Sequence, residues 1–127
     1  MPPAAKQGDQ IVAIDTHLIL TPSGVTSPVP HPFSGIIDGA LSSDVMIQGM
    51  PAATVDSTAT NTPPHIPIGG SFVNPPKNKG KIIKGSATVM INGKAAARAG
   101  DTAETCNDPT DLPVGTVVAV STVMIGG

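Results

Sequence analysis

The sequence has very few aromatic residues, with two Phe and no Trp or Tyr among 127 residues. A core that lacks aromatic side chains must be filled by Val, Ile, Met and Ala. These small aliphatic residues suit narrow, tightly layered strands better than a wide sandwich. A chain of this length builds one domain with a modest core. The shortage of aromatic residues therefore predicts a slim β-structure.

Four further absences exclude classes of protein. The single Cys cannot form an internal disulfide. No run of about 18 apolar residues suggests a membrane span, and no basic segment followed by an apolar run marks a signal peptide. The net charge of -2 gives no electrostatic reason to expect nucleic acid or an anionic membrane as partner. We expect a chain that does not use the ordinary secretion route.

Gly and Pro are abundant, at 14 residues each, and they separate short apolar runs. In such places they indicate turns between strands. No helical apolar period of convincing length is present, and Ala95–Ala99, the one helix-favouring run, is bracketed by glycines. The predicted fold class is therefore all-β, with short strands and Pro/Gly-rich loops.

One short phrase occurs three times, and one copy is divided between the two ends of the chain. Residues 45–53 (VMIQGMPAA) match residues 89–97 (VMINGKAAA), and residues 123–127 (VMIGG) and 1–5 (MPPAA) supply the halves of the third copy. A repeat divided in this way makes sense only if the two ends meet in space, and periodicity outranks local propensity. The simplest such object is a single domain, residues 1–127, with approximate threefold symmetry.

A turn signal closes each copy of the repeat. Gly8-Asp9 after copy one matches Gly100-Asp101 after copy three and, more loosely, Asp56-Ser57 after copy two. Short polar side chains at such positions satisfy the backbone of a turn.

Between the copies, strands and loops are predicted from local signals. Ile11–Asp15 is expected to form a first strand that ends in a loop carrying His17. Residues 101–113 are expected to form another loop, which holds Cys106, and residues 117–125 a closing strand.

All three histidines and the one cysteine take related places in this repeat. His17 and His65 each lie eight residues after the acid or serine that closes a copy, and Cys106 lies five residues after its equivalent. Threefold packing is expected to bring these three loops together at one end of the axis. There His31, from a Pro-rich hairpin, can supply a fourth donor.

Three imidazoles and one thiolate form a tetrahedral donor set that suits zinc, and iron is the next candidate. Four protein ligands leave no open coordination position, so the site is predicted to be structural rather than catalytic. Taken singly, a His is more often a surface residue and a Cys more often a small buried hydrophobe. Their common register with the repeat favours one joint metal site. No nucleophile elbow surrounds Ser34 and no phosphate-binding loop is present, so no enzymatic activity is expected.

Met46, Met90 and Met124 each occupy the middle of a Val-Met-Ile triplet. The middle residue of a strand faces opposite to its neighbours. Either Val and Ile point to the core with Met outside, or the reverse holds. Outward-facing methionines would form an apolar, deformable ring on one face, which is a natural contact surface.

Residues 1–5, 49–53 and 93–101, with the Val-Met-Ile triplets, resemble the PAAR-repeat proteins that tip the spikes of contractile injection machines. The His/His/His/Cys set and the divided repeat extend this resemblance over nearly the whole chain. It implies a small pseudo-threefold cone of short strands. The broad base of the cone would cap a trimeric, VgrG-like β-helical spike protein, and its apex would hold zinc. By position, the implied zinc ligands are His17, His31, His65 and Cys106.

The resemblance also implies a passive role, as one monomeric cap on a trimer that passes transiently through a target membrane. Since the repeats run from the first residue to the last, no attached toxin domain is expected, although effectors can ride on the flanks. Such a part is assembled in the bacterial cytoplasm and expelled with its machine. The machine can be a type VI secretion system, an extracellular injection particle or a phage-like tail.

Two other classes of function stay open at the level of sequence. A small zinc-dependent enzyme could use three His ligands with Cys106 as an exchangeable fourth, but it needs an open metal position and a general base. An adhesin or phage-tail module without metal is the other, and retention of stoichiometric zinc would count against it.

Overall fold

The computed structural model describes residues 2–126, which form strands and loops and no helix. The predicted all-β fold class is confirmed. In this range there is also no helix with the length and apolarity needed to cross a membrane. The strands are β1 (Gln10–Leu20), β2 (Thr26–Gly39), β3 (Met46–Ile47), β4 (Met50–Pro51), β5 (Thr58–Asn61), β6 (Ser71–Phe72), β7 (Lys79–Ile82), β8 (Met90–Ile91), β9 (Lys94–Ala95), β10 (Thr102–Thr105) and β11 (Leu112–Val118).

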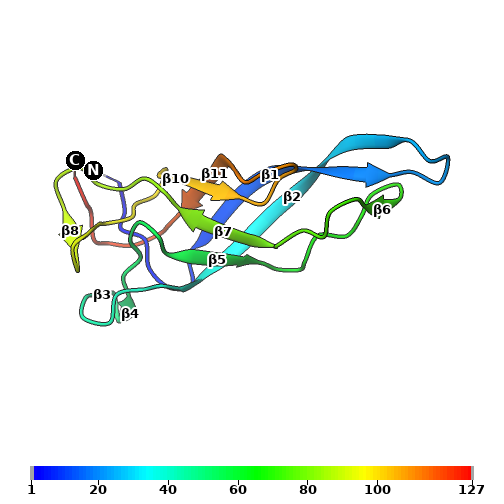
Figure 1. Cartoon of the computed structure of the whole chain (residues 1–127). Coiled ribbons are helices and arrows are strands. Elements are labelled where there is room, and N and C mark those ends of the chain that lie inside the picture. Colours follow the sequence, from blue (N-terminus) through cyan, green and yellow to red (C-terminus); the bar gives the residue numbers. More distant parts are fainter. Residues whose placement is uncertain (1, 127) are drawn as a thin grey trace.

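Six strands form a closed, barrel-like cone. They follow the order β11-β10-β7-β5-β2-β1, and an antiparallel pairing of β11 with β1 closes the ring. The short strand β6 adds to the far end of β1. As Figure 1 shows, the long β1–β2 hairpin projects beyond the shorter strands, so the molecule narrows toward that end.

The three repeat copies meet around an axis at the opposite, broad end. Ala5 N donates to the carbonyl oxygen of Ala97, Ala97 N to that of Ala53, and Ala53 N to that of Ala5, each at 3.0 Å. These alanines are buried, and their small side chains allow three backbones to approach this closely. The triangle of hydrogen bonds confirms the predicted pseudo-threefold arrangement.

The divided copy is completed where the two ends of the chain lie together. Ile125 N donates to the carbonyl oxygen of Pro2 at 3.0 Å, and Ala4 N donates to that of Val123 at 2.8 Å. Copies two and three make the second of these bonds within themselves. Met1 and Gly127, the outermost residues of the predicted copy, lie outside the described residues.

The turn that closes each copy uses a left-handed backbone conformation. The φ angle is 93° at Gly8, 87° at Gly100 and 78° at Asp56, which confirms that Asp56 takes the glycine position in copy two. The next residue then accepts a hydrogen bond from the backbone nitrogen three residues earlier. These acceptors are Asp9 at 2.9 Å, Ser57 at 2.9 Å and Asp101 at 2.6 Å.

Phe33 fills the middle of the barrel. A Cβ atom at Gly35 would lie 2.8 Å from the Phe33 ring, and one at Gly80 would lie 3.2 Å from it. Both glycines are therefore required by the space that this ring occupies. The aliphatic side chains packed in the same core include Ile11, Ile37, Ile82 and Val117.

Three local predictions about strands and loops were wrong. β1 does not end at Asp15, because it pairs with β2 along its whole length, and His17 therefore lies within a strand. Part of the predicted loop 101–113 is strand β10, which pairs with β7 and β11. The closing strand is Leu112–Val118 rather than residues 117–125. In each case a pairing partner distant in sequence determines where the strand ends.

Candidate metal centre and apolar base

Five chemically reactive side chains meet inside the narrow half of the cone. Successive side chains alternate across a strand, so Asp15 and His17 on β1 both face inward. His31 on β2 is paired directly opposite Asp15. His65 comes from the loop between β5 and β6, and Cys106 directly follows β10. All five side chains are buried.

Four of the five form a tight group, in which one ligand atom from each of Asp15, His17, His65 and Cys106 lies within 4.8 Å of the others. His65 Nε2 lies 2.8 Å from Asp15 Oδ2, and the Cys106 thiol donates to the same oxygen at 3.4 Å. Cys106 Sγ also lies 3.7 Å from His17 Nε2.

His31 lies beside this group. Its ring centroid is 5.6 Å from that of His17 and 5.7 Å from that of His65, and the latter two are 4.9 Å apart. Imidazoles that share a tetrahedral zinc ion have centroids roughly 5 Å apart, given a Zn–N bond of about 2 Å. His31 Nδ1 donates to the carbonyl oxygen of Val29 at 2.8 Å, which leaves the lone pair on Nε2. That Nε2 is buried and has no hydrogen-bond partner among the described residues.

The structure thus brings together three of the four predicted ligands, His17, His65 and Cys106, and places His31 at their edge. Asp15 joins the group and was missed by the sequence analysis. Its signal was the two-residue spacing to His17, which puts both side chains on one face of a strand. The prediction that β1 ends at Asp15 concealed that signal.

The surroundings of the group favour uncharged side chains when no cation is present. Burial lowers the pKa of His17, and the nearby His65 lowers it further, against the opposing influence of Asp108 and Asp15. Burial also raises the pKa of the Cys106 thiol to about 11, with the negative charge of Asp15 as the next cause. A cation in this space would oppose the cost of forming the thiolate.

Polar side chains behind the group hold its members in place. Asp108 Oδ2 lies 3.5 Å from His17 Nδ1 and accepts a hydrogen bond from Leu18 N at 2.8 Å. Asn78 Oδ1 accepts from His65 N at 2.8 Å, and Asn61 Nδ2 donates to the same atom at 3.2 Å. Such outer contacts are typical of the residues that orient metal ligands.

Both phenylalanines of the chain flank the group. Phe33 lies on the side of the barrel core, with its ring centroid 6.1 Å from that of His65. Phe72 lies on the side of the hairpin tip, because it pairs with Ile19 on β1, and its ring is 5.6 Å from His17 and 5.4 Å from His31. The two rings shield the group from water along the axis of the cone.

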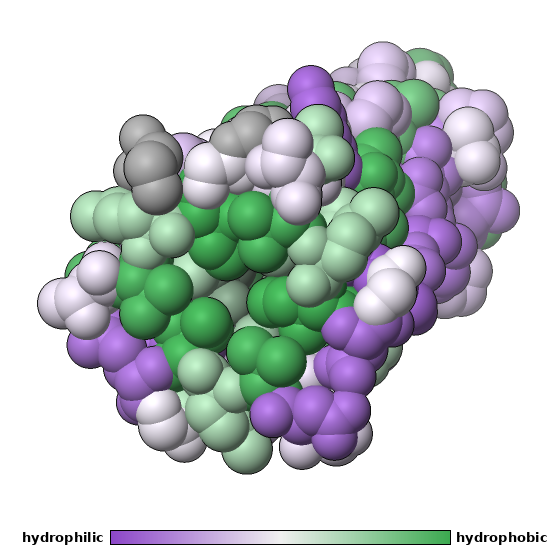
Figure 2. Space-filling model, turned by 90° about the vertical axis from the view of Figure 1, so that its left-hand side faces the viewer, coloured by the Kyte–Doolittle hydropathy of each residue, from purple (hydrophilic) through white to green (hydrophobic). Residues whose placement is uncertain are grey.

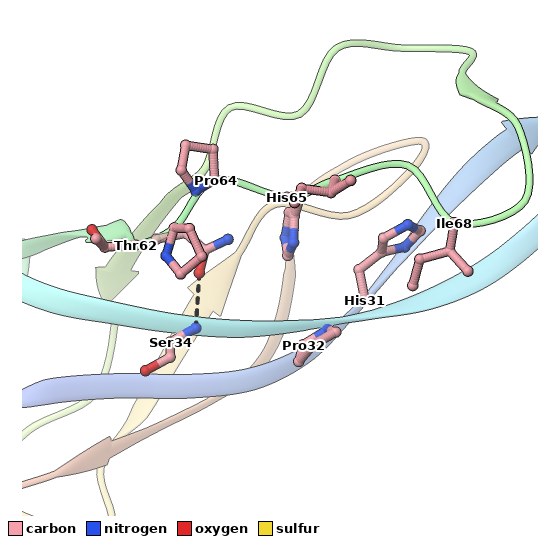
Figure 3. Close-up of a pocket in the computed structure, with 10 residues that line it drawn as sticks. His31, Pro32, Ser34, Thr62, Pro64, His65 and Ile68 are labelled. Carbon is pink, nitrogen blue, oxygen red and sulfur yellow. Dashed lines mark hydrogen bonds between the residues drawn. The ribbon is translucent and has the colours of Figure 1, made fainter.

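Two hollows lie beside the group. The first has a volume of about 340 Å³, and Figure 3 shows His31 and His65 at its wall together with Pro64 and Ile68. The second, of about 470 Å³, is lined by His17 and Cys106 among other residues. The side chains of His31 and His65 therefore border one hollow, and those of His17 and Cys106 border the other.

These residues fit a metal ion. Buried polar groups are normally hydrogen-bonded, and buried charges are paired or bind metals. His31 Nε2 is buried and has no hydrogen-bond partner in the described part of the chain. Imidazole nitrogen, thiolate sulfur and carboxylate oxygen are all donors for zinc and related ions.

The broad end carries an exposed apolar surface, which we call the base ring. Its methionines face outward, with Met46 55% exposed, Met90 62% and Met124 49%. The neighbouring isoleucines are buried, so of the two orientations open from the sequence, the one with Met outside is correct. Figure 2 shows apolar residues gathered around a hollow on this face of the molecule. The base ring consists of Met46, Met50, Met90, Val123 and Met124.

Comparison with known protein families agrees with this structure. A family model for the PAAR motif matches residues 26–106 and 74–127. The chain therefore belongs to the PAAR-motif family, as its resemblance to spike-tip proteins predicted. A search of curated proteins returned no significant match.

Proposed function

We propose that this chain is the spike tip of a contractile injection machine, with the base ring bound to the end of a trimeric β-helical spike. It is assembled in the cytoplasm and expelled with the machine. The observation that carries the proposal is the threefold base, in which three repeat copies present equivalent outward methionines. Membership of the PAAR-motif family supports the same role.

A threefold base suits a trimeric partner for reasons of symmetry. A spike of three identical chains ends in three equivalent strand edges, which are exposed and prone to pairing. One chain with three repeats can contact all three in the same way, whereas a chain without internal symmetry would have to contact each edge differently. Flexible methionine side chains adapt to such a surface. The expected stoichiometry is one chain for each trimer.

We further propose that His17, His31, His65 and Cys106 bind one structural zinc ion, with iron as the second choice. When bound, the ion would cross-link β1, β2, the β5–β6 loop and the end of β10. Support comes from the spacing of the three imidazole rings and from the unpartnered Nε2 atom of His31. Cross-links of this kind add folding free energy where a small domain has little core.

The tip of the cone is suited to passage through a membrane. Residues 16–37 and 57–76 contain no Asp, Glu, Lys or Arg. Beyond the metal centre these segments expose Leu20, Val25 and Ile66, and the hairpin backbone is paired along its length. An uncharged tip whose two strands pair with each other has a lower cost of desolvation than a charged one. We therefore assign membrane penetration to the hairpin end.

The docking proposal is tested by charges on the base ring. Met90→Asp and Met46→Asp should weaken binding to the trimeric spike by about 2–4 kcal/mol, as expected at the centre of an interface. The melting temperature should barely change, because both side chains are exposed. Val25→Asp at the tip, a residue that is 59% exposed, is the matched control and should bind like the parent. Normal spike binding by both Met variants would contradict the proposal.

Metal content separates this function from the two alternatives. Elemental mass spectrometry of the purified chain should find one zinc per chain. A folded protein without metal would favour the metal-free tail or adhesin module. A zinc ion with an exchangeable water and hydrolytic activity would favour the enzyme.

A further inference from the structure

Asp15 is a buried carboxylate in an unusual setting. Its side chain is 0% exposed, and it projects into the core from the middle of β1. Within residues 2–126, four of the six lysines and the arginine form ion pairs with other acids, and the ionic partner of Asp15 is His65. A buried charge is costly unless it is paired or faces a metal ion. The fold therefore has to supply Asp15 with a positive charge.

The two carboxylate oxygens of Asp15 make different contacts: one bonds to the barrel and the other faces the candidate metal ligands. Oδ1 accepts a hydrogen bond from the Thr105 hydroxyl, which is itself buried. Oδ2 faces His65 Nε2 at 2.8 Å and Cys106 Sγ at 3.4 Å. Thr105 and Cys106 are adjacent, so the same short segment holds the carboxylate and supplies the thiolate. Asp15 is thus placed against the donor atoms from the side of the barrel core.

Charge balance explains why a carboxylate belongs there. A divalent ion held by three neutral imidazoles and one thiolate keeps a single net positive charge. Burial of that charge between Phe33 and Phe72 would be expensive. The Asp15 carboxylate, directly against the donor atoms, offsets that remaining charge, whereas Asp108 lies on the outer side of His17, 3.5 Å from its Nδ1. No other acidic side chain belongs to the tight group in the described part of the chain.

We propose that Asp15 is the charge-balancing positioning residue of the metal centre, held by Thr105 and acting outside the coordination sphere. The inference rests on the proposed metal site and deepens it. The carboxylate neutralises the centre and orients His65 and Cys106, while His31 completes the four donors. Outer residues of this kind typically change metal affinity by about 10–100-fold when they are replaced.

The test measures zinc affinity in the full-length chain by competition with a chromophoric chelator. Asp15→Asn, which keeps the shape and removes the charge, should weaken zinc binding by about 10–100-fold. Thr105→Val, which removes the support and keeps the charge, should weaken it less. Asp101→Asn is the matched control, because Asp101 is a buried acid at the base, paired with Arg98. It should leave zinc affinity unchanged even if it lowers stability.

Cobalt(II) substitution distinguishes positioning from ligation. The absorption bands of tetrahedral cobalt with a thiolate ligand should be the same in Asp15→Asn as in the parent. A change of coordination number would show that Asp15 is a ligand and would overturn the proposal. Unchanged zinc affinity in Asp15→Asn would overturn it as well. If Asp15→Asn does not fold, Thr105→Val decides, and zinc release from it at the parental rate would refute the assignment.

Failure of this inference differs from failure of the proposed metal site. A parent chain that holds no zinc or cobalt under any condition would refute the site itself. A parent that binds metal tightly, with Asp15→Asn indistinguishable from it, would refute only the role of Asp15.

Discussion

The base and the metal end of this cone are stabilised in different ways. At the base, three copies of one phrase make the same contacts, and a closed triangle of backbone hydrogen bonds joins Ala5, Ala53 and Ala97. At the metal end, the donors come from dissimilar segments: the two strands of the β1–β2 hairpin, the β5–β6 loop and the residue after β10. The base is therefore symmetric and built from backbone, whereas the metal end is asymmetric and depends on side chains.

Because the two ends are stabilised differently, mutations at the base and mutations at the metal end should have different effects. A backbone triangle has no single side chain whose loss removes it, so the base should tolerate most exposed substitutions. At the metal end, the proposed ion would concentrate the stabilisation in a few donor atoms, so the loss of one donor would weaken several segments together. Substitutions at the two ends should therefore have separable consequences.

The largest effect is expected from removal of metal donors. The double variant His65→Ala/Cys106→Ala should lose the metal and destabilise the fold by on the order of 5 kcal/mol. The melting temperature, measured by calorimetry, should fall by roughly 20 °C. Treatment of the parent with a strong chelator should cause a similar fall and should not affect the double variant further. Loss of spike binding by a folded double variant would show that the two ends are not independent.

A moderate loss of stability is expected from overpacking the barrel core, which lies between the base and the metal end. Gly35→Ala places a Cβ atom 2.8 Å from the Phe33 ring, which must move to accommodate it. We expect a destabilisation of about 1–3 kcal/mol, typical of overpacking, in denaturant unfolding. Ser34→Ala, at the neighbouring outward-facing position, is the control and should lie within about 0.5 kcal/mol of the parent. Equal stability of both variants would show that Phe33 does not fill the barrel as described.

A smaller effect is expected from pH. In the metal-free protein, the free energy of unfolding should depend on the ionisation of His17 and Cys106 at the metal end. The pKa of His17 is lowered below 6.5, so the unfolded chain binds more protons and stability should fall as the pH drops below 6.5. The pKa of Cys106 is raised from 9.0 to about 11, so the folded chain keeps its proton longer and stability should fall as the pH rises through this window.

Unfolding free energies measured across this pH range should therefore be highest between the two windows. His17→Gln should remove the acidic fall, and Cys106→Ala should remove the alkaline one. An acidic fall that persists unchanged in His17→Gln would assign it to another group.

The smallest effect concerns a departure from threefold symmetry at the base. Asp56 adopts a φ of 78° where the other two copies have glycine. Asp56→Gly should stabilise the protein by up to about 1 kcal/mol, because a left-handed conformation costs a residue with a Cβ atom about that much. The Asp56→Gly variant also loses the ion pair between Asp56 and Lys94, but this pair is half exposed and contributes little to stability. Gly100→Asp, the reverse exchange in copy three, should destabilise by a similar amount, and no difference between the two would contradict this account.

The base could be predicted from the sequence because its structure follows from local chemistry. Small alanines, a glycine or aspartate in a tight turn and a polar acceptor one residue later recur at fixed spacing. The same spacing predicted that the ends of the chain meet. Only the outward orientation of Met46 and its equivalents remained open, because alternation along a strand defines two faces without saying which one is buried.

The sequence by itself determined the all-β class, the threefold register of the repeats and the candidate nitrogen and sulfur ligands. Tertiary structure alone decided how those donors meet. β1 continues past Asp15 because β2 supplies a hydrogen-bond partner along its whole length, and no local signal encodes such a pairing. That continuation turns Asp15 and His17 inward together and sets Asp15 opposite His31. The buried acid beside the donors is thus a product of strand pairing, since only pairing determines which side chains share an interior.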